Sequence, residues 1–554
     1  MAEILMKEIY NYFMIRLRQR WRQLILFVAD YFDRNSVELY YRQKPPPIAR
    51  GAPKVILFEG MWDNPNHWLR SWMFLQAILK GNEADIIGIL RSRTDVIKKR
   101  SLEALGIRRF IYISDAFDQN GAFLSQAEGL LRHVESPHEM LRLKLPDDLP
   151  AYTYYDTLIR MARHPQPVIK DNPVCQKVLT EVLSLGKFYR DIFEKHKVMA
   201  VVSCQPWKNE WSTLCWTALR RNVPFYYMTA HYNSIRIRKM SAPEDYKAAN
   251  EHMSYREFCS LPERVRNHLI ERGRTYLKDR FSGDSDFVII RYAMNPAFRD
   301  RDKVEFLREL GLAPEKPLVV IYAHSWFDFP HAQAMSHFTD PLDWVQLTIQ
   351  TVTPLSDINW AIKPHPCDQW YGGIGIHDLV KRELPPHMVI LPEPSDSLAI
   401  QSLADVLVTI HGSIAIEAVA LGKPVLCADR SYYTDWGFTH TAVSREDYVE
   451  KLRHILSLER PTIEQSRNAM AYASIYLGAP PREEGYLKLP CDTLFRERTL
   501  LYDLLRKMLR NDMRSIYQEI ERMREWLLSS HSSFNVWRII RYYSQLSKVN
   551  SEQC

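Results

Sequence analysis

Short apolar runs alternate with helical segments in two separate series, and this alternation constrains the fold more than any other feature. In the first series, runs such as KVILFEG (54–60) and VMAVVSC (198–204) are separated by segments with helical periodicity. A second series begins with PLVVIYAH (317–324) and continues through DVLVTIHG (405–412). Runs that are apolar throughout are typical of parallel strands covered by helices on both faces. The sequence therefore predicts two doubly wound α/β domains.

The length of the chain agrees with this division. At 554 residues it is too long for one ordinary core. We expect four parts: leading helices and a Pro-rich linker in residues 1–50, a first Rossmann-like domain in 51–285, a second in 286–486, and carboxyl-terminal helices in 487–554.

Composition argues against several classes of protein. The eight cysteines are scattered, with no C-x-x-C pair, so we expect no disulfide framework, no metal site and a reducing, cytoplasmic location. The net charge of +7 permits an anionic partner without choosing one, and no basic and aromatic motif indicates nucleic-acid binding. A run of about 18 apolar residues is absent, so we expect no membrane-spanning helix.

The amino-terminal stretch YNYFMIRLRQRWRQLILFVADYF (10–32) mixes arginines with large apolar side chains. Leu17, Trp21 and Leu24 repeat at helical spacing, and four arginines between residues 16 and 22 accompany that stripe. Such a helix suits peripheral contact with the anionic inner face of the cytoplasmic membrane. The alternative is an ordinary packed helix with a solvated basic face.

A small polar turn separates the run ending at Ile410 from the helical pattern that follows. Gly412 permits close approach of a ligand to the backbone, while His411 and Ser413 lie at the predicted carboxyl end of a strand. Ser413 can cap the helix and present its hydroxyl to an anion, and Glu417 can accept hydrogen bonds from a ribose. The alternative is a capped helix with a solvated glutamate.

The stretch NWAIKPHP (359–366) is a predicted strand that leads into a loop stiffened by two prolines. The prolines hold Lys363 and His365 in place, which favours a phosphate-binding or leaving-group role over a polar surface.

Aromatic residues follow the next predicted strand in DRSYYTDWGFT (429–439). Tyr432 and Trp436 suit stacking against a base or sugar, and packing in the core is the alternative for each.

Together, KPHP, TIHGSIAIEAVALGKPV and SYYTDWGFT resemble the donor-binding half of bacterial capsule and surface-polysaccharide glycosyltransferases with the GT-B fold. They are most similar to the capsule family that includes the β-Kdo transferases. The resemblance covers about residues 315–452, with looser agreement in 152–285. It implies two Rossmann-like domains facing a cleft, with the acceptor bound by the first and the nucleotide-sugar donor by the second.

The resemblance also implies roles for individual residues. His365 would contact the donor phosphate, while Ser413 and Glu417 would hold the phosphate and the ribose. The donor sugar would be Kdo or another nonulosonic-type sugar carried by CMP, and no cofactor or metal is implied. The expected substrate-binding residues are Lys363, His365, His411, Gly412, Ser413, Glu417, Tyr432 and Trp436.

Transfer of a sugar also requires an acid, base or nucleophile that faces the donor. Besides His365, the candidates at predicted loop positions of the first domain are Glu59, Asp63, Asp156 and His231. The acidic motif of the capsule Kdo transferases has no aligned counterpart here, so the mechanism and the sugar stay open.

We therefore expect a glycosyltransferase that moves a sugar to a surface glycan or its lipid-linked acceptor. A CDP-polyol phosphotransferase of teichoic-acid type is one alternative, and it requires a catalytic histidine such as His231 in the first domain. A UDP-hexosamine epimerase on the same fold is another, and it needs no acceptor. A scaffold without enzymatic activity would bind no nucleotide.

Overall fold

The computed structural model describes residues 54–62, 65–117, 120–169, 172–229, 235–247, 253–283, 288–295, 301–368, 375–380, 384–478 and 513–551. The predicted basic helix near the amino terminus lies outside these residues, as do the candidates Asp63 and His231.

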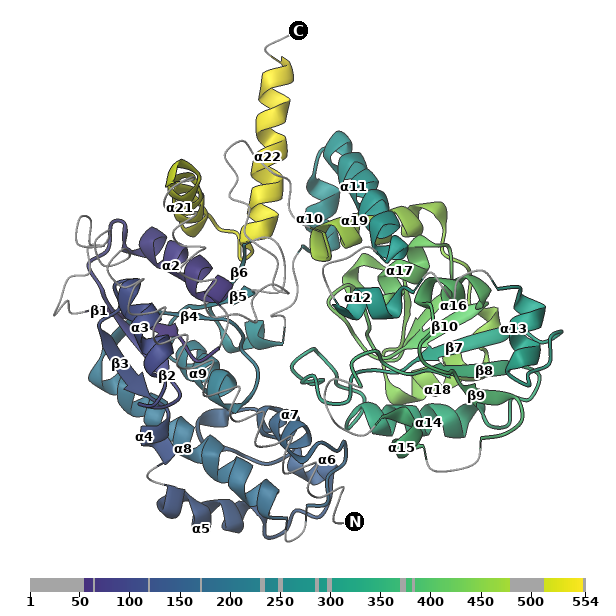
Figure 1. Ribbon diagram of the computed structural model, residues 1–554, viewed down its shortest axis with the longest axis horizontal. Helices are drawn as coiled ribbons and strands as arrows, with labels where there is room; N and C mark the ends of the chain where they lie inside the picture. The colour runs from purple at the N-terminus through teal and green to yellow at the C-terminus, as the bar shows by residue number, and fades with distance from the viewer. Residues whose placement is uncertain are drawn as a thin grey trace, which may run out of the picture.

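The first domain contains a six-stranded sheet in the order β3-β2-β1-β4-β5-β6 (Figure 1). All its pairings are parallel except that of β5 with β6. The strands are β1 (Lys54–Glu59), β2 (Asp85–Leu90), β3 (Arg109–Tyr112), β4 (Lys197–Ser203), β5 (Phe225–Thr229) and β6 (Arg236–Met240).

The second domain contains a six-stranded parallel sheet in the order β12-β11-β10-β7-β8-β9. Its strands are β7 (Leu318–Tyr322), β8 (Asn359–Lys363), β9 (Met388–Ile390), β10 (Val406–Thr409), β11 (Val425–Cys427) and β12 (His440–Thr441). Numbered within their own domains, both sheets follow the Rossmann order 3-2-1-4-5-6. The predicted fold class is thereby confirmed: two Rossmann-like domains of the GT-B type.

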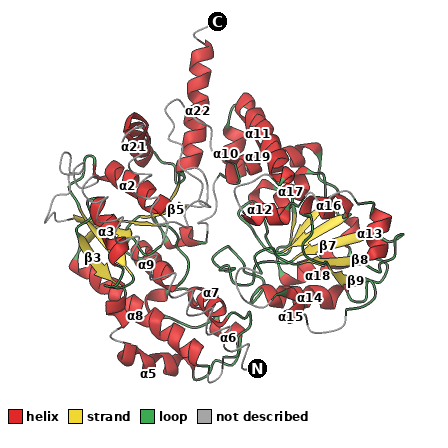
Figure 2. Cartoon of the chain, in the orientation of Figure 1, coloured by secondary structure: helices red, strands yellow, loops and turns green. Residues whose placement is uncertain are grey.

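Helices surround the sheet in each domain, as Figure 2 shows. Those near the first sheet are α2 (Pro65–Leu79), α3 (Val96–Ala104), α4 (Ser114–Phe117), α5 (Asn120–Leu131), α6 (Pro137–Met140), α7 (Ala151–Ala162), α8 (Pro173–Lys195) and α9 (Asn209–Leu219). Those near the second are α10 (Tyr255–Ser260), α11 (Glu263–Ser282), α12 (Val288–Ala293), α13 (Lys303–Glu309), α14 (Pro341–Val352), α15 (Ile376–Leu379), α16 (Ser397–Leu403), α17 (Ile414–Ala420), α18 (Arg445–Arg453) and α19 (Ile463–Tyr476).

The helix α11 packs in the core of the second domain. Its buried Val265 and Leu269 belong to the same apolar cluster as Leu318 of β7. At Gly273 the helix lies so close to α19 that a Cβ atom would stand 1.7 Å from the carbonyl oxygen of Met470. The predicted domain boundary near residue 285 thus falls after a helix that packs with the second sheet.

The carboxyl-terminal helices α21 (Met513–Leu527) and α22 (Phe534–Ser551) contact the first domain (Figure 1). Ile520 and Trp526 of α21 are buried in the cluster that contains α2. The helix α22 touches β6, yet its Val536 and Ile539 are buried in the core of the second domain. It therefore joins the two domains.

None of the helices in the described residues combines the length and the apolarity needed to span a lipid bilayer.

Candidate active site

Three histidines follow neighbouring strands of the second sheet: His324 follows β7, His365 follows β8 and His411 follows β10. The ring centroids of His324 and His411 are 4.6 Å apart, and those of His324 and His365 are 6.2 Å apart. We call these three residues the histidine cluster. Because β7 and β10 flank the point where the strand order reverses, the cluster occupies the usual ligand position of a doubly wound sheet.

His411 is the most unusual member of the cluster. Its side chain is 2% exposed, and within the described part of the chain neither ring nitrogen has a hydrogen-bond partner. Leaving a buried polar atom without a partner costs about 1–3 kcal/mol. A ligand that hydrogen-bonds to His411 would remove this cost.

Burial keeps the cluster neutral. It lowers the pKa of His365 to about 3, with further contributions from the charges of His324 and Lys363. Burial and neighbouring histidines also place the pKa of His411 well below its ordinary value. His365 Nδ1 accepts a hydrogen bond from the backbone N–H of Cys367 at 3.2 Å. Its proton is therefore on Nε2, where it can be donated to a phosphate oxygen.

The turn after His411 is held by side chains around Gly412. The Gly412 N–H donates to Thr409 Oγ1 at 3.2 Å, and Tyr433 OH donates to the Gly412 carbonyl at 2.8 Å. A Cβ atom at Gly412 would lie 2.9 Å from Thr409 Oγ1, so the turn is fitted to glycine. Ser413 already has helical backbone angles (φ −61°, ψ −16°), and its side chain does not cap α17, contrary to the predicted cap.

Glu417 is buried and its carboxylate is engaged. Arg280 Nε of α11 donates to Glu417 Oε1 at 2.8 Å, and Gln401 Nε2 donates to the other oxygen at 3.5 Å. Burial by itself would lower the pKa of Arg280, but the charge of Glu417 outweighs it and the pKa is raised. The glutamate is therefore not solvated, contrary to the alternative interpretation of the sequence. Both oxygens of its carboxylate already accept hydrogen bonds within the protein.

Lys363 also has internal partners. Its ammonium donates to Glu393 Oε1 at 2.9 Å and to Ser395 Oγ at 3.0 Å, and the residue is 2% exposed. These contacts tie the end of β8 to the loop after β9, so the lysine stabilises the loop around His365.

The two aromatic candidates pack against other rings. Trp436 is 2% exposed, its Nε1 donates to the carbonyl of Met253 at 2.9 Å, and it contacts Phe258. It has no exposed face on which a base could stack, so packing explains it better than ligand binding. Tyr432 is half-buried, with its ring centroid 4.3 Å from that of Tyr476.

Asp156 lies on α7 of the first domain but contacts the second. Its carboxylate accepts a hydrogen bond from Nδ1 of His331, in the loop between β7 and α14. Sequence reasoning assigned no role to His324 or His331. Both lie in the segment that follows the strand ending at Tyr322, and position after a strand was the only available signal.

The switch point of the first sheet holds a second buried polar group. Glu59, His67 and Cys204 offer ligand atoms that all lie within 4.8 Å of one another, and they form the one such group in the described residues. Glu59 Oε1 accepts from the N–H groups of Met61 and Trp62 at 2.6 and 2.9 Å. Burial would raise the pKa of Glu59, but the hydrogen bond and charge of His67 lower it to about 2. This group could hold a metal ion, although backbone donors already engage the carboxylate.

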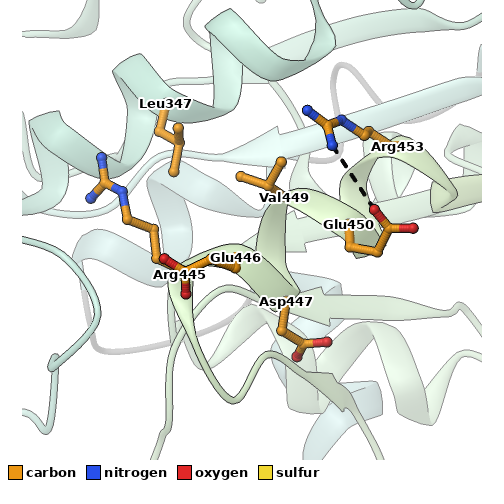
Figure 3. A pocket seen from close by; sticks show the side chains of 7 residues that line it. All are labelled: Leu347, Arg445, Glu446, Asp447, Val449, Glu450 and Arg453. Carbon is orange, nitrogen blue, oxygen red and sulfur yellow. Dashed lines mark ion pairs between the residues drawn. The ribbon is translucent and has the colours of Figure 1, made fainter.

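A surface cavity of about 610 Å³ lies elsewhere, between α14 and α18. Figure 3 shows its lining, which consists of Leu347, Arg445, Glu446, Asp447, Val449, Glu450 and Arg453. None of these residues belongs to the strand ends that carry the histidines.

No protein-family model matches the chain, and no curated protein matches it in sequence. Among solved structures, a Thermosulfurimonas dismutans KpsC β-Kdo 2,4 transferase is similar, with 14% identity, a TM-score of 0.32, and coverage of 51% of this chain and 85% of that one. A UDP-GlcNAc 2-epimerase from Neisseria meningitidis matches with 12% identity, a TM-score of 0.26 and coverage of 82% and 99%.

A glycosyltransferase from Rickettsia africae matches with 13% identity, a TM-score of 0.24, and coverage of 85% of this chain and 99% of that chain. These neighbours are glycosyltransferases and an epimerase that resemble this chain in fold. Because the identities and TM-scores are so low, the function proposed below rests on the side chains of the site.

Proposed function

We propose that this chain is a nucleotide-sugar-dependent glycosyltransferase that transfers a sugar to a surface polysaccharide or its lipid-linked acceptor. The observation that carries the proposal is His411, a buried side chain with two unpartnered ring nitrogens at the switch point of a Rossmann-like sheet. That position is where doubly wound domains bind nucleotides.

The histidine cluster would bind the donor phosphate. His365 Nε2 and one nitrogen of His411 would donate hydrogen bonds that strengthen as charge develops on the leaving oxygen. The Ser413 hydroxyl, which α17 does not use, would add a third donor. Glu417 would act through Arg280, which it holds in place, rather than by contacting the ribose directly.

The remaining parts of the proposal concern the partners. The donor would be a CMP-linked nonulosonic sugar such as Kdo, bound by the second domain, and the acceptor would be bound by the first. The basic helix predicted near the amino terminus would place the enzyme at the inner face of the cytoplasmic membrane, close to a lipid-linked acceptor.

A thermal-shift panel tests whether the site binds nucleotide. CMP, CDP, UDP and GDP are each added to the wild type, and at least one should raise the melting temperature by mass action. His411→Ala and His365→Ala should lose most of that shift. His454→Ala is the matched control, because His454 is an exposed histidine on the same domain.

Two results would contradict the proposal: no nucleotide stabilises the wild type, or the cluster variants respond as the wild type does. The panel and an activity assay also separate the alternatives. Turnover of CDP-glycerol would favour the phosphotransferase, and conversion of a UDP-hexosamine without acceptor would favour the epimerase.

A further inference from the structure

An aspartate and a histidine from different domains form a buried pair. Asp156 Oδ1 on α7 accepts a hydrogen bond from His331 Nδ1 at 2.6 Å. Asp156 is 1% exposed and His331 is 6% exposed. The pair is thus shielded from water. In such an interior a hydrogen bond to a carboxylate is stronger than it is in water.

The carboxylate of Asp156 fixes the loop as well as the ring. Its second oxygen accepts hydrogen bonds from the backbone N–H groups of His331 and Ala332, both at 3.1 Å. Three donors therefore hold one carboxylate, and the imidazole has a single orientation. Because Nδ1 carries the donated proton, the lone pair of the neutral ring lies on Nε2.

The second ring nitrogen of His331, Nε2, takes no part in the contacts with Asp156. His331 Nε2 is buried and has no hydrogen-bond partner among the described residues. The ring lies in the loop after β7 that also carries His324 of the histidine cluster. A packing role explains the bond at Nδ1 but leaves Nε2 unexplained.

Further contacts press this loop onto α7. Tyr155 OH donates to Asp340 Oδ2 at 2.7 Å, and Arg160 Nη1 donates to the carbonyl of Phe327 at 3.0 Å. These bonds flank the Asp156–His331 pair along both segments, α7 and the loop after β7. The pair therefore exists only while the two domains are in contact at α7.

We propose that His331 is the general base of the transfer reaction and that Asp156 is its positioning residue. This inference rests on the proposed function. In the transfer step the O–H bond of the acceptor breaks and its proton passes to His331 Nε2. The acceptor oxygen forms a bond to the anomeric carbon, and the bond from that carbon to the leaving oxygen breaks with its electron pair remaining on the nucleotide. The order aspartate, Nδ1–H, Nε2 and substrate hydroxyl is that of a catalytic triad base.

The test is the pH dependence of kcat/KM for the wild type, His331→Gln and Asp156→Asn. Turnover is followed as release of CMP from CMP-Kdo and of UDP from UDP-N-acetylglucosamine. The wild type should show an acidic limb where the base becomes protonated. His331→Gln should lose that limb and about 10²–10⁴-fold in rate. Asp156→Asn should lose rate as well, because the amide cannot hold the Nδ1–H tautomer.

Tyr155→Phe is the matched control, because it removes a neighbouring bond between the domains and leaves the pair intact. It should keep the position of the acidic limb. In all variants the nucleotide-induced thermal shift should persist, since the histidine cluster is unchanged. A wild type that binds no nucleotide contradicts the proposed function, whereas a normal pH profile in His331→Gln overturns the general base alone.

Proton NMR of the resting enzyme gives a second readout that needs no turnover. The strongly hydrogen-bonded Nδ1–H of His331 should give a resonance shifted far downfield, which Asp156→Asn abolishes and Tyr155→Phe retains. The absence of that resonance from the wild type would overturn the pair itself.

Discussion

At the scale of single residues, burial determines what the polar groups of the second domain can do. Lys363 and Glu417 are both buried and both have charged partners inside the protein. His411 is buried and His365 is half-buried, both without such partners, and desolvation lowers the pKa of each ring so that both stay neutral. Charged groups that already have a partner stabilise the fold, and the neutral imidazoles remain available to a ligand.

The low pKa of His365 predicts acid sensitivity. Its pKa is about 3 in the folded protein against an ordinary 6.5, so the unfolded chain binds the proton more readily. The stabilisation of the folded state that results from this pKa difference is present above pH 6.5 and is lost as pH falls from there toward 3. His365→Gln should therefore flatten the loss of stability across this window in urea unfolding at several pH values. An unchanged slope relative to the wild type would contradict the burial of a neutral ring.

Because Glu417 forms an ion pair with Arg280, we predict that removing its charge lowers the free energy of unfolding. Glu417→Gln leaves the partly buried Arg280 without its carboxylate, and breaking such a pair costs up to about 3–5 kcal/mol when it is buried. Chemical unfolding should show this loss without any nucleotide present. Full stability combined with weak nucleotide binding would instead support direct contact between Glu417 and the ribose.

At the scale of elements, α11 packs closely against α19 in the second domain. Gly273 is the point of contact, because any side chain there would meet the backbone of Met470. Since Arg280 lies on the same helix, this packing also places the partner of Glu417.

Gly273→Ala should therefore destabilise the protein by about 1–3 kcal/mol, as expected for overpacking. Gly186→Ala is the matched control: Gly186 lies within α8, and a Cβ atom there meets nothing within 4 Å. It should stabilise by about 0.5–1 kcal/mol, because alanine is the better helix former. Equal effects of the two substitutions in thermal unfolding would contradict the close approach.

The elements also show how far the sequence can predict the structure. Strands such as β1, β4 and β10 each contain a continuous apolar run, and the sequence predicts them close to their observed bounds. The edge strand β6, with the sequence RIRKM, mixes charged and apolar residues without a continuous apolar run and was missed. The helix α11 was expected with the first domain, because apolar spacing shows that a helix has a buried face but not which sheet covers it.

The same limit applies to the site. His365 and His411 could be identified because each directly follows a strand, and parallel strands bring their carboxyl ends to one edge. The contact between Asp156 and His331 joins residues 175 positions apart, and no local pattern encodes it. Burial of Trp436 likewise depends on Phe258, which is distant in the sequence.

At the scale of the whole molecule, the described residues connect the two domains through α7 and through α22. The helix α7 contacts the loop between β7 and α14, and the buried residues of α22 reach both domains. Arg236 of β6 adds hydrogen bonds to the carbonyls of Tyr476 and Gly478 at the end of α19. These contacts hold the two domains in a defined arrangement.

The most direct test of the central claim is a crystal structure of the protein soaked with CMP and, separately, with UDP. We predict nucleotide bound at the carboxyl ends of β7, β8 and β10, with a phosphate oxygen within hydrogen-bond distance of His365 Nε2 and a ring nitrogen of His411. A nucleotide bound elsewhere, or a histidine cluster that stays without a ligand at saturating concentrations of both, would contradict the account.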